Sequence, residues 1–261
     1  MIAELPFLCG FAFLAGFVDA VAGGGGLIQI PALFLFLPQI AAANPATILG
    51  TNKLSSICGT TVAMAQYARQ VPIDWRAILP AGLAAFTFSY FGAMTVTRIP
   101  AAILRPLVLV LLIAVAVYTF VNKRFGDRHA PRFQGQAQTV LAVVTGLGIG
   151  FYDGFFGPGT GSFLIFVFIG LFGFDFLAAS ACSKVINVAT NLSAVLYFAA
   201  TDHILYEVAL PMGLCNVLGA LLGARLAILK GNRFVRGFFL LVAAAMILRF
   251  GYDLLHLTAI E

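Results

Sequence analysis

The amino-acid sequence predicts an all-α polytopic membrane protein built from two inverted internal repeats. Three observations predict it: too few charges for a water-exposed surface, a series of apolar segments of membrane-spanning length, and a pattern of polar residues that occurs twice. Of the 261 residues, 61% are hydrophobic and 10% are charged, and the mean hydropathy is +1.02. A soluble domain keeps roughly a quarter of its residues charged. The composition therefore excludes a soluble enzyme, a nucleic-acid-binding protein and a disordered chain.

The start of the chain and its cysteines restrict the class further. The first charged residue is Glu4, and no basic region or small-residue cleavage site precedes Gly23, so we expect no cleaved signal peptide. The four cysteines lie in apolar stretches without a CxxC pair. This placement favours buried reduced thiols over a disulfide or a zinc site.

Apolar segments separated by short polar stretches predict the helices. A helix needs about 18 residues to cross a hydrocarbon core of about 30 Å, and most of the segments reach that length. Two shorter segments, 26–37 and 161–173, follow glycine-rich breaks at 23–26 and 157–161. Whether these two cross the membrane fully or re-enter it on one side stays open. The apolar segments are 5–22, 26–37, 46–68, 77–97, 103–121, 138–156, 161–173, 177–200, 208–227 and 234–255.

Polar residues recur at fixed spacings and indicate an internal duplication. The motif Gly16-Phe17-Val18-Asp19 returns as Gly150-Phe151-Tyr152-Asp153, 134 residues later, and five further residues return after 131. Such duplications are common in secondary transporters. We therefore expect a first membrane repeat at 1–121, a basic cytoplasmic linker at 122–137 and a second membrane repeat at 138–261. The pairs spaced by 131 are Lys53 and Lys184, Pro80 and Pro211, Gly82 and Gly213, Gly92 and Gly223, and Arg105 and Arg236.

The distribution of Lys and Arg indicates that the second repeat is inverted. Basic residues accumulate in short cytoplasmic loops. We count each repeat as a glycine-broken helical hairpin plus three transmembrane helices, with the N-terminus outside. Ten basic residues then lie inside, the second repeat is inverted, and both termini lie outside. The inner residues are Arg69, Arg76, Lys123, Arg124, Arg128, Arg132, Arg225, Lys230, Arg233 and Arg236, whereas Arg98, Arg105 and Arg249 lie outside.

Lys53 and Lys184 lie inside apolar segments, where a cation costs about 2.5–3.5 kcal/mol at the bilayer centre. Each follows a predicted helix N-cap, Asn44 or Asp175, by nine residues. Nine helical residues rise about 13 Å, which reaches the middle of the core. In the inverted arrangement the two ammonium groups converge near the midplane and attract an anion. The alternatives are structural ion pairs with nearby aspartates, or side chains that extend along a water-filled crevice.

The glycine-rich breaks indicate the same region as a site for an anion. A helix cannot run through four glycines or through Gly-Pro-Gly without losing backbone hydrogen bonds. Inside a membrane such backbone persists only where it is buried or lines a wet cavity. The helix after each break presents free N–H groups and its positive dipole end, which suits an anion. The alternative is a tight turn that lets helices cross closely. The predicted substrate-binding residues of the breaks are Gly24, Gly25, Gly26, Gly159, Thr160 and Gly161.

Asp19 and Asp153 precede the two breaks at equivalent positions. They are candidates to carry a proton, to hold a coupling cation, to pair with the lysines or to cap nearby N–H groups, and the sequence leaves these alternatives open. Neutral donors flank the lysines, and they either contact the substrate or bond between helices. These donors are Thr51, Asn52, Ser183 and Asn187.

We predict surface positions for three aromatic residues and for the three histidines. Tyr67, Trp75 and Tyr206 lie near segment ends and are predicted to form the aromatic belt at the membrane interface. The three histidines have no partner at metal-ligand spacing, so we expect them on the solvated surface and expect neither a metal site nor a cofactor. They are His129, His203 and His256.

Several motifs of the first repeat occur together in a known family. They are residues 16–28 (GFVDAVAGGGGLI), Pro31-Ala32-Leu33, Thr51-Asn52-Lys53 and Asp74-Trp75. In them the chain resembles the TauE/SafE sulfite-exporter family, also called the toluene sulfonate uptake permease family, over essentially its whole length. The resemblance implies a carrier in the bacterial inner (cytoplasmic) membrane for sulfite, organosulfonates or related small anions. The second repeat departs from the motifs, with Cys182-Ser183-Lys184 in place of Thr-Asn-Lys, so the two halves of any site are unequal.

The functional hypothesis is an alternating-access carrier of a small sulfur-containing anion, neutralised by Lys53 and Lys184 and bound by backbone N–H groups of the breaks. One alternative is an anion channel with the same cations in a continuous pore. An intramembrane enzyme is disfavoured, because the apolar segments hold too few His, Asp and Glu residues for a catalytic cluster. The expected partners are the anion and the lipid bilayer, with proton or cation coupling and no nucleic acid. The anion, the direction of transport and the oligomeric state stay open.

Overall fold

The structure, a computed structural model, describes residues 4–100, 102–103, 132–133 and 135–257. Expectations for the remaining residues therefore stay predictions. They concern most of the segment 103–121, the linker through residue 131, and Arg105, Lys123, Arg124, Arg128 and His129.

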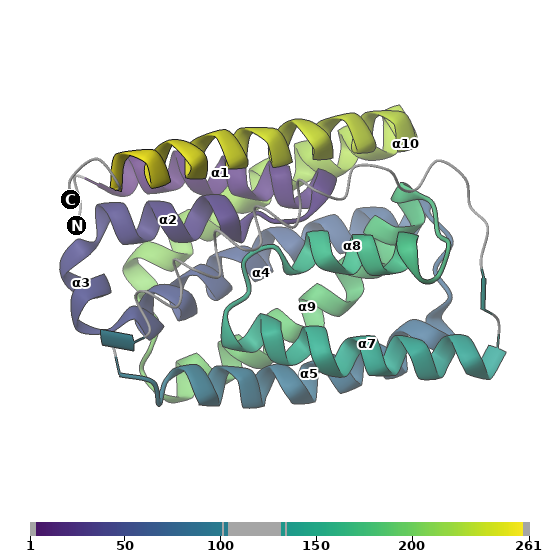
Figure 1. Cartoon of the computed structure of the whole chain (residues 1–261), viewed down its shortest axis with the longest axis horizontal. Coiled ribbons are helices and arrows are strands. Elements are labelled where there is room, and N and C mark those ends of the chain that lie inside the picture. The colour runs from purple at the N-terminus through teal and green to yellow at the C-terminus, as the bar shows by residue number, and fades with distance from the viewer. Residues whose placement is uncertain (1–3, 101, 104–131, 134, 258–261) are drawn as a thin grey trace.

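Throughout the described residues, every regular element is a helix, and these helices confirm the predicted all-α class (Figure 1). Their ends agree closely with the apolar segments. The helices are α1 (Leu5–Ala22), α2 (Gly26–Phe36), α3 (Pro38–Ala43), α4 (Pro45–Gln70), α5 (Trp75–Val96), α7 (Gly135–Phe155), α8 (Thr160–Gly170), α9 (Phe176–Ala200) and α10 (Tyr206–Leu257).

Two features of the helix pattern were not predicted. The short helix α3 begins at Pro38, directly after α2, and six residues are too few to show a periodic pattern. The predicted segments 208–227 and 234–255 follow one another within α10 and are separated only by Gly231, whose φ of 68° and ψ of −166° are not helical. Glycine adopts a positive φ without the steric cost that a side chain imposes.

Three of the described helices are long and apolar enough to cross a membrane: Leu5–Ala22, Trp75–Val96 and Tyr206–Gly231. The helices α2 and α8 are apolar but only 11 residues long. The helices α4 and α9 have 26 and 25 residues, and they bring polar side chains into the interior. The chain is therefore a multi-pass membrane protein that buries a polar centre.

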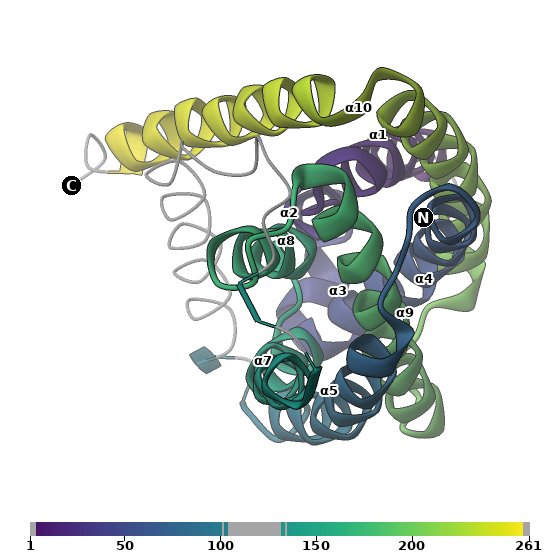
Figure 2. The ribbon, with the colours of Figure 1, turned by 90° about the vertical axis from the view of Figure 1, so that its right-hand side faces the viewer.

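The helix boundaries repeat at the spacings seen in the sequence. α2 and α8 start at residues 26 and 160, α4 and α9 at 45 and 176, and α5 and α10 at 75 and 206. The helices also exchange partners between the two halves, because α1 packs mainly against α10 and α5 packs mainly against α7 (Figure 2). Gly92 of α5 lies against the Phe151 carbonyl of α7, and its counterpart Gly223 lies against the Phe17 carbonyl of α1.

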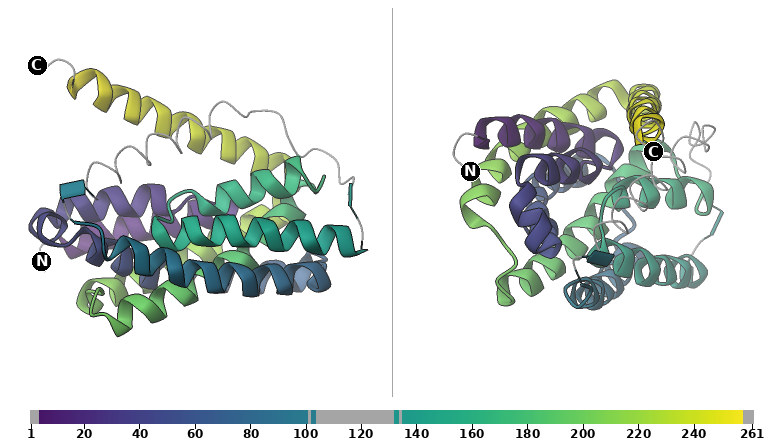
Figure 3. Two further views of the ribbon diagram at one scale, coloured as in Figure 1. Left: turned by 60° about the horizontal axis from the view of Figure 1, so that its bottom comes forward. Right: turned by 60° about the vertical axis from the view of Figure 1, so that its left-hand side comes forward.

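Corresponding helices run in opposite directions along the molecule. In Figure 1, α1 and α4 run from left to right, whereas α7 and α9 run from right to left. The short helices α2 and α8 both start near the centre and run towards opposite ends. The helix α1 begins, and α10 ends, at the same end of the molecule (Figure 3).

One of the three predicted belt residues lies in the core instead. Tyr67 is fully buried, and its hydroxyl donates a hydrogen bond to the Ala20 carbonyl at 3.0 Å. The prediction was wrong because α4 continues to Gln70, which leaves Tyr67 one turn inside the helix and facing α1. Trp75 and Tyr206 are exposed, as the belt requires.

Candidate functional site

The two glycine-rich breaks contact each other at the centre of the molecule. A Cβ atom placed on Gly23 would lie 2.4 Å from the carbonyl carbon of Gly161, closer than any side chain can approach. Gly23 also has a φ of 74°, which glycine adopts most readily. The Ser162 hydroxyl donates across the contact to the Ala22 carbonyl at 3.2 Å. Glycine is therefore required here for the close approach of the two halves.

Both lysines are buried beside this contact. Lys53 is 2% exposed and Lys184 is 0% exposed. Each lies nine residues after its helix N-cap, as predicted. The Asp175 carboxylate caps α9 by accepting a hydrogen bond from the Ala178 N–H at 2.8 Å, whereas the Asn44 side chain makes no such bond.

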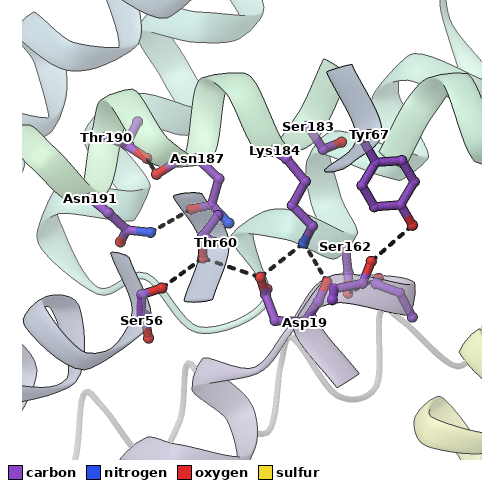
Figure 4. Close-up of polar contacts among 12 residues, drawn as sticks. Asp19, Ser56, Thr60, Tyr67, Ser162, Ser183, Lys184, Asn187, Thr190 and Asn191 are labelled. Atoms are coloured by element: carbon purple, nitrogen blue, oxygen red, sulfur yellow. Dashed lines mark hydrogen bonds and ion pairs between the residues drawn. The ribbon is translucent and has the colours of Figure 1, made fainter. Parts of the chain in front are cut away.

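Each lysine forms an ion pair with the aspartate of the other half. Lys53 Nζ lies 2.8 Å from Asp153 Oδ2. Lys184 Nζ lies 2.9 Å from Asp19 Oδ2, and Figure 4 shows this second pair. Lys184 Nζ also donates to the backbone carbonyl of Asp19. Of the alternatives left open by the sequence, pairing between lysines and aspartates is the one present in this structure. The four formal charges cancel, which offsets part of the cost of holding them in a low-dielectric interior.

A small polar cavity lies between the two breaks, with a volume of about 20 Å³. A space of this size holds about one water molecule. Most of the predicted site residues line it. They are Asp19, Gly24, Gly25, Gly26, Asn52, Lys53, Asp153, Gly159, Thr160, Gly161 and Asn187.

Three predicted site residues are absent from the cavity wall. The Thr51 hydroxyl donates to the Thr47 carbonyl at 2.7 Å, and Ser183 donates to the Ala179 carbonyl at the same distance. Lys184 lies behind Asp19, with which it pairs. The Thr51 hydroxyl also accepts a hydrogen bond from the Leu205 N–H at 3.1 Å, just before α10. Both hydroxyls are therefore engaged by backbone groups, and Lys184 acts on the cavity through Asp19.

Four cavity residues were not among the predicted ones: Ser56, Thr60, Gly157 and Asn191. The repeat spacing could have identified Ser56, because it stands 131 residues before the predicted Asn187, whereas Thr60 and its counterpart Asn191 were both unpredicted. Gly157 has a φ of 93°, and a Cβ atom placed on it would lie 2.8 Å from Lys53 Nζ. This glycine therefore leaves the space that the lysine ammonium occupies.

The neutral side chains form short hydrogen-bonded links around the cavity (Figure 4). The Thr60 hydroxyl lies 3.3 Å from Asp19 Oδ2 and 2.9 Å from the Ser56 carbonyl, and it has one hydrogen to donate between them. Asn191 donates to the amide oxygen of Asn187 at 3.1 Å, which fixes the orientation of that amide. The buried amide oxygen of Asn52 has no hydrogen-bond partner within the described part of the chain. The wall therefore keeps polar groups that a small ligand can bind.

The helices α2 and α8 both begin at the cavity. Their N-caps are Gly25 and Gly159, and neither helix has a side-chain cap. The positive ends of two helix dipoles thus face the same small space, which favours a negatively charged group. Among the described residues, no group of three or more His, Cys, Asp or Glu side chains has the arrangement of a metal site.

Comparisons with known proteins show that the chain is similar to membrane transporters. Residues 8–250 match the family described as sulfite exporter TauE/SafE. The chain is 38% identical over 254 residues to a probable membrane transporter protein, ORF9, of a Sinorhizobium species, covering 97% of this chain and 94% of the relative. It is 34% identical to a probable membrane transporter protein of Haemophilus influenzae, covering 95% of each chain. It is 33% identical to the probable membrane transporter protein YfcA of Escherichia coli, covering 95% and 91% of the two chains. No solved structure matches the chain significantly.

Proposed function

Because the chain belongs to the TauE/SafE sulfite exporter family, we propose that it moves sulfite, organosulfonates or related small sulfur-containing anions across the membrane by alternating access. The family and its curated relatives identify a membrane transporter, not an enzyme. A small-molecule substrate and a lipid surface follow from that class. The substrate and the mechanism are the proposal, and the cavity between the two glycine breaks carries it.

The cavity wall has the chemistry that binds an oxoanion. The Lys53 ammonium supplies a positive charge, and the starts of α2 and α8 add two helix dipoles. The amides of Asn52 and Asn187 and the hydroxyl of Thr60 provide further donors to oxygen atoms. A sulfonate or sulfite group has three oxygens on one sulfur, and donors that converge from several helices suit that shape. The two carboxylates that share the wall must be neutralised or turned away for such binding.

The cavity is too small for the substrate in this conformation. A space that holds about one water molecule cannot accept a sulfur atom with three oxygens. Substrate binding therefore requires side chains to move. The ion pairs beside the cavity are the contacts that have to loosen. We interpret the structure as a closed conformation in which the aspartates occupy the place of the substrate charge.

Alternating access requires two related halves around one central site. The repeated helix starts, the exchanged packing of α1 with α10 and α5 with α7, and the opposite directions of corresponding helices support two inverted repeats. The repeats 1–121 and 138–261 would rock about the ion pairs that join them. The location proposed for the protein is the bacterial inner (cytoplasmic) membrane, with both termini outside.

The experiment that tests the proposal is counterflow in proteoliposomes. Vesicles loaded with unlabelled sulfite or methanesulfonate should take up the labelled anion faster than protein-free vesicles, and the uptake should saturate with concentration. An anion channel would instead pass large single-channel currents and show no counterflow. Absence of saturable counterflow with both anions would disprove the proposed substrate class.

A further inference from the structure

We propose that Asp19 carries a proton together with the substrate, so that each monovalent anion crosses the membrane with one proton. The inference rests on the proposed transport of small anions and specifies how that transport is driven. It is carried by the charge balance of the site, by the lack of room in the cavity and by the difference between the two ion pairs.

The charge balance requires a positive partner for the anion. Lys53, Lys184, Asp19 and Asp153 together carry no net charge. A monovalent anion added to this set leaves one uncompensated negative charge in a buried site, which is strongly unfavourable. A proton that binds to one carboxylate restores neutrality. The proton comes from water on one side, forms an O–H bond with a carboxylate oxygen, and returns to water when the anion leaves on the other side.

Protonation also changes which hydrogen bonds the cavity wall can form. A carboxylate accepts hydrogen bonds only and repels an anion, whereas a protonated carboxyl group has an O–H that can donate to one. Because the cavity has no spare volume, the anion must displace part of an existing ion pair. An anion that arrives at Lys53 brings a further negative charge beside both carboxylates of the wall, so the same event favours uptake of a proton by the carboxylate that water reaches.

The two aspartates differ in access to water. The Asp19 side chain is 15% exposed and lines the cavity, whereas that of Asp153 is 2% exposed. The Thr60 hydroxyl also lies 3.3 Å from Asp19 Oδ2. A hydroxyl can donate to a charged carboxylate and can accept from a neutral carboxyl group, so it can bond to both forms. Both carboxylates line the cavity, and Asp19 is the more exposed of the two to a proton from water.

The lysine partners differ as well. Lys184 donates both to the Asp19 carboxylate and to the Asp19 backbone carbonyl, so it keeps an acceptor when the carboxylate is protonated. Lys53 is paired with the Asp153 carboxylate and lines the cavity, where its ammonium faces the anion. Asp19 is thus the carboxylate that can take up a proton while its lysine keeps a partner, and Lys53 is the cation that contacts the substrate.

The surroundings of Asp19 contain few other titratable groups. Lys184 of α9 is in contact, Lys53 of α4 and Asp153 of α7 share the cavity wall, and Tyr67 of α4 donates to the carbonyl of the next residue. The neighbouring elements contribute neutral side chains near this turn, Asn216 from α10 beside Gly16 and Ser162 from α8. A metal cation in place of the proton would have to lie against the Lys184 ammonium, which disfavours sodium coupling.

Wild-type proteoliposomes give the first test. Methanesulfonate is the probe, because its single charge does not change over the pH range used, and a trapped pH-sensitive dye reports proton movement. We expect one proton to enter with each anion, and an inward gradient of about one pH unit to support roughly ten-fold accumulation. A membrane potential should have no effect on this electroneutral uptake. Uptake without proton entry, or accumulation driven by a sodium gradient, would overturn the proposal.

The Asp19→Asn variant gives the second test. Its amide resembles the protonated carboxyl group in charge, and Lys184 keeps the backbone carbonyl as an acceptor. We expect counterflow to persist and to become independent of pH, while the roughly ten-fold accumulation in a pH gradient falls to equilibration. The matched control is Asp202→Asn on the surface, where the positive φ of 54° suits asparagine, and this variant should accumulate the probe like the wild type.

The outcomes separate the two proposals. Proton-driven accumulation that survives in Asp19→Asn would refute the role of Asp19. If this variant fails to fold, proton entry in the wild type still decides whether the coupling exists, and Asp153→Asn then tests the second carboxylate: accumulation lost there would refute the assignment to Asp19. Absence of counterflow in the wild type would overturn the proposed function, and this inference with it.

Discussion

The site depends on four charged residues whose pairing crosses the two halves of the chain. A buried lysine in a membrane needs a counter-charge, and here that charge comes from an aspartate in the other half of the chain. The arrangement ties α4 to α7 and α9 to α1 at the position where the substrate is proposed to bind. The same contacts therefore stabilise the closed conformation and must be loosened during transport.

We expect the Lys53–Asp153 pair to behave as a unit in stability measurements. Removing one partner of a buried ion pair costs about 3–5 kcal/mol, because the other charge is left uncompensated. Lys53→Ala and Asp153→Ala should each lower the thermal midpoint in detergent, and the double variant should lose less stability than the sum of the two. Transport should be lost in Lys53→Ala and in the double variant, since both lack the cation of the cavity.

The control for this cycle is Lys230→Ala. Lys230 is exposed, and its Nζ lies 5.1 Å from the centre of the Phe234 ring near the Gly231 kink. This variant should retain both the thermal midpoint and counterflow. Strictly additive losses in the cycle would show that the pair contributes no coupling energy, contrary to its geometry.

At the residue scale the sequence predicted the charged members of the site and not their partners. The sequence identified these four residues because a charge in an apolar helix is energetically costly and therefore marks a structural or functional position. They are Lys53, Lys184, Asp19 and Asp153. Which lysine meets which aspartate depends on how the repeats pack, and the sequence left that open. Ser56, Thr60 and Asn191 were missed because small neutral polar residues are common at helix contacts in membranes and carry little energetic signal.

At the scale of elements, the glycine breaks determine the geometry of the site. Each break ends a long helix and starts a short one, so that α2 and α8 begin at the cavity instead of at a membrane surface. The sequence predicted this change of element because runs of glycine and Gly-Pro-Gly interrupt helices. It could not show that the breaks contact each other, because that contact joins residues about 140 apart.

The contact between the breaks predicts a strong effect for Gly23→Ala. The added methyl group would lie 2.4 Å from the Gly161 carbonyl carbon, and the φ of 74° is unfavourable for alanine. Strain of this kind costs about 1–3 kcal/mol before any backbone shift is counted. We expect a lower thermal midpoint and loss of counterflow, because the shift separates the two breaks that line the cavity.

Gly10→Ala is the matched control within the same helix. No atom lies within 4 Å of a Cβ placed on Gly10, so the substitution should leave counterflow intact. It should also raise stability by about 0.5–1 kcal/mol, the usual gain for Gly to Ala inside a helix. Equal effects of Gly23→Ala and Gly10→Ala on transport would contradict a role for the close approach.

At the scale of the whole molecule, the two halves of the described chain are interwoven instead of forming separate lobes. The most extensive interhelical packing joins α1 to α10 and α5 to α7, each between the first and the second half of the chain. Polar residues at fixed spacings predict a duplication, but the sequence could not predict the exchange of helices between the two halves, because lipid-facing and helix-facing apolar surfaces have similar compositions. The interwoven packing places the ion pairs at the centre of both halves.

The distribution of basic residues makes a prediction for the molecule as a whole, its orientation in the membrane. The start of α5, which carries Arg76, lies at the same end of the molecule as the start of α7 and the bend within α10 (Figure 1). The connection between α9 and α10, which carries Asp202, lies at the opposite end. Because Lys and Arg accumulate on the cytoplasmic side, the end with Arg76 should face the cytoplasm.

Cysteine labelling in intact cells tests this orientation, since Arg76 and Asp202 are both exposed. In a background where the four native cysteines are replaced by serine, the Asp202→Cys variant should react with a membrane-impermeant thiol reagent added outside. The Arg76→Cys variant should react only after the cells are permeabilised. The reverse pattern would place both termini in the cytoplasm and would invert the side from which each half opens to the substrate, while the central ion pairs and the proton balance would stay as described.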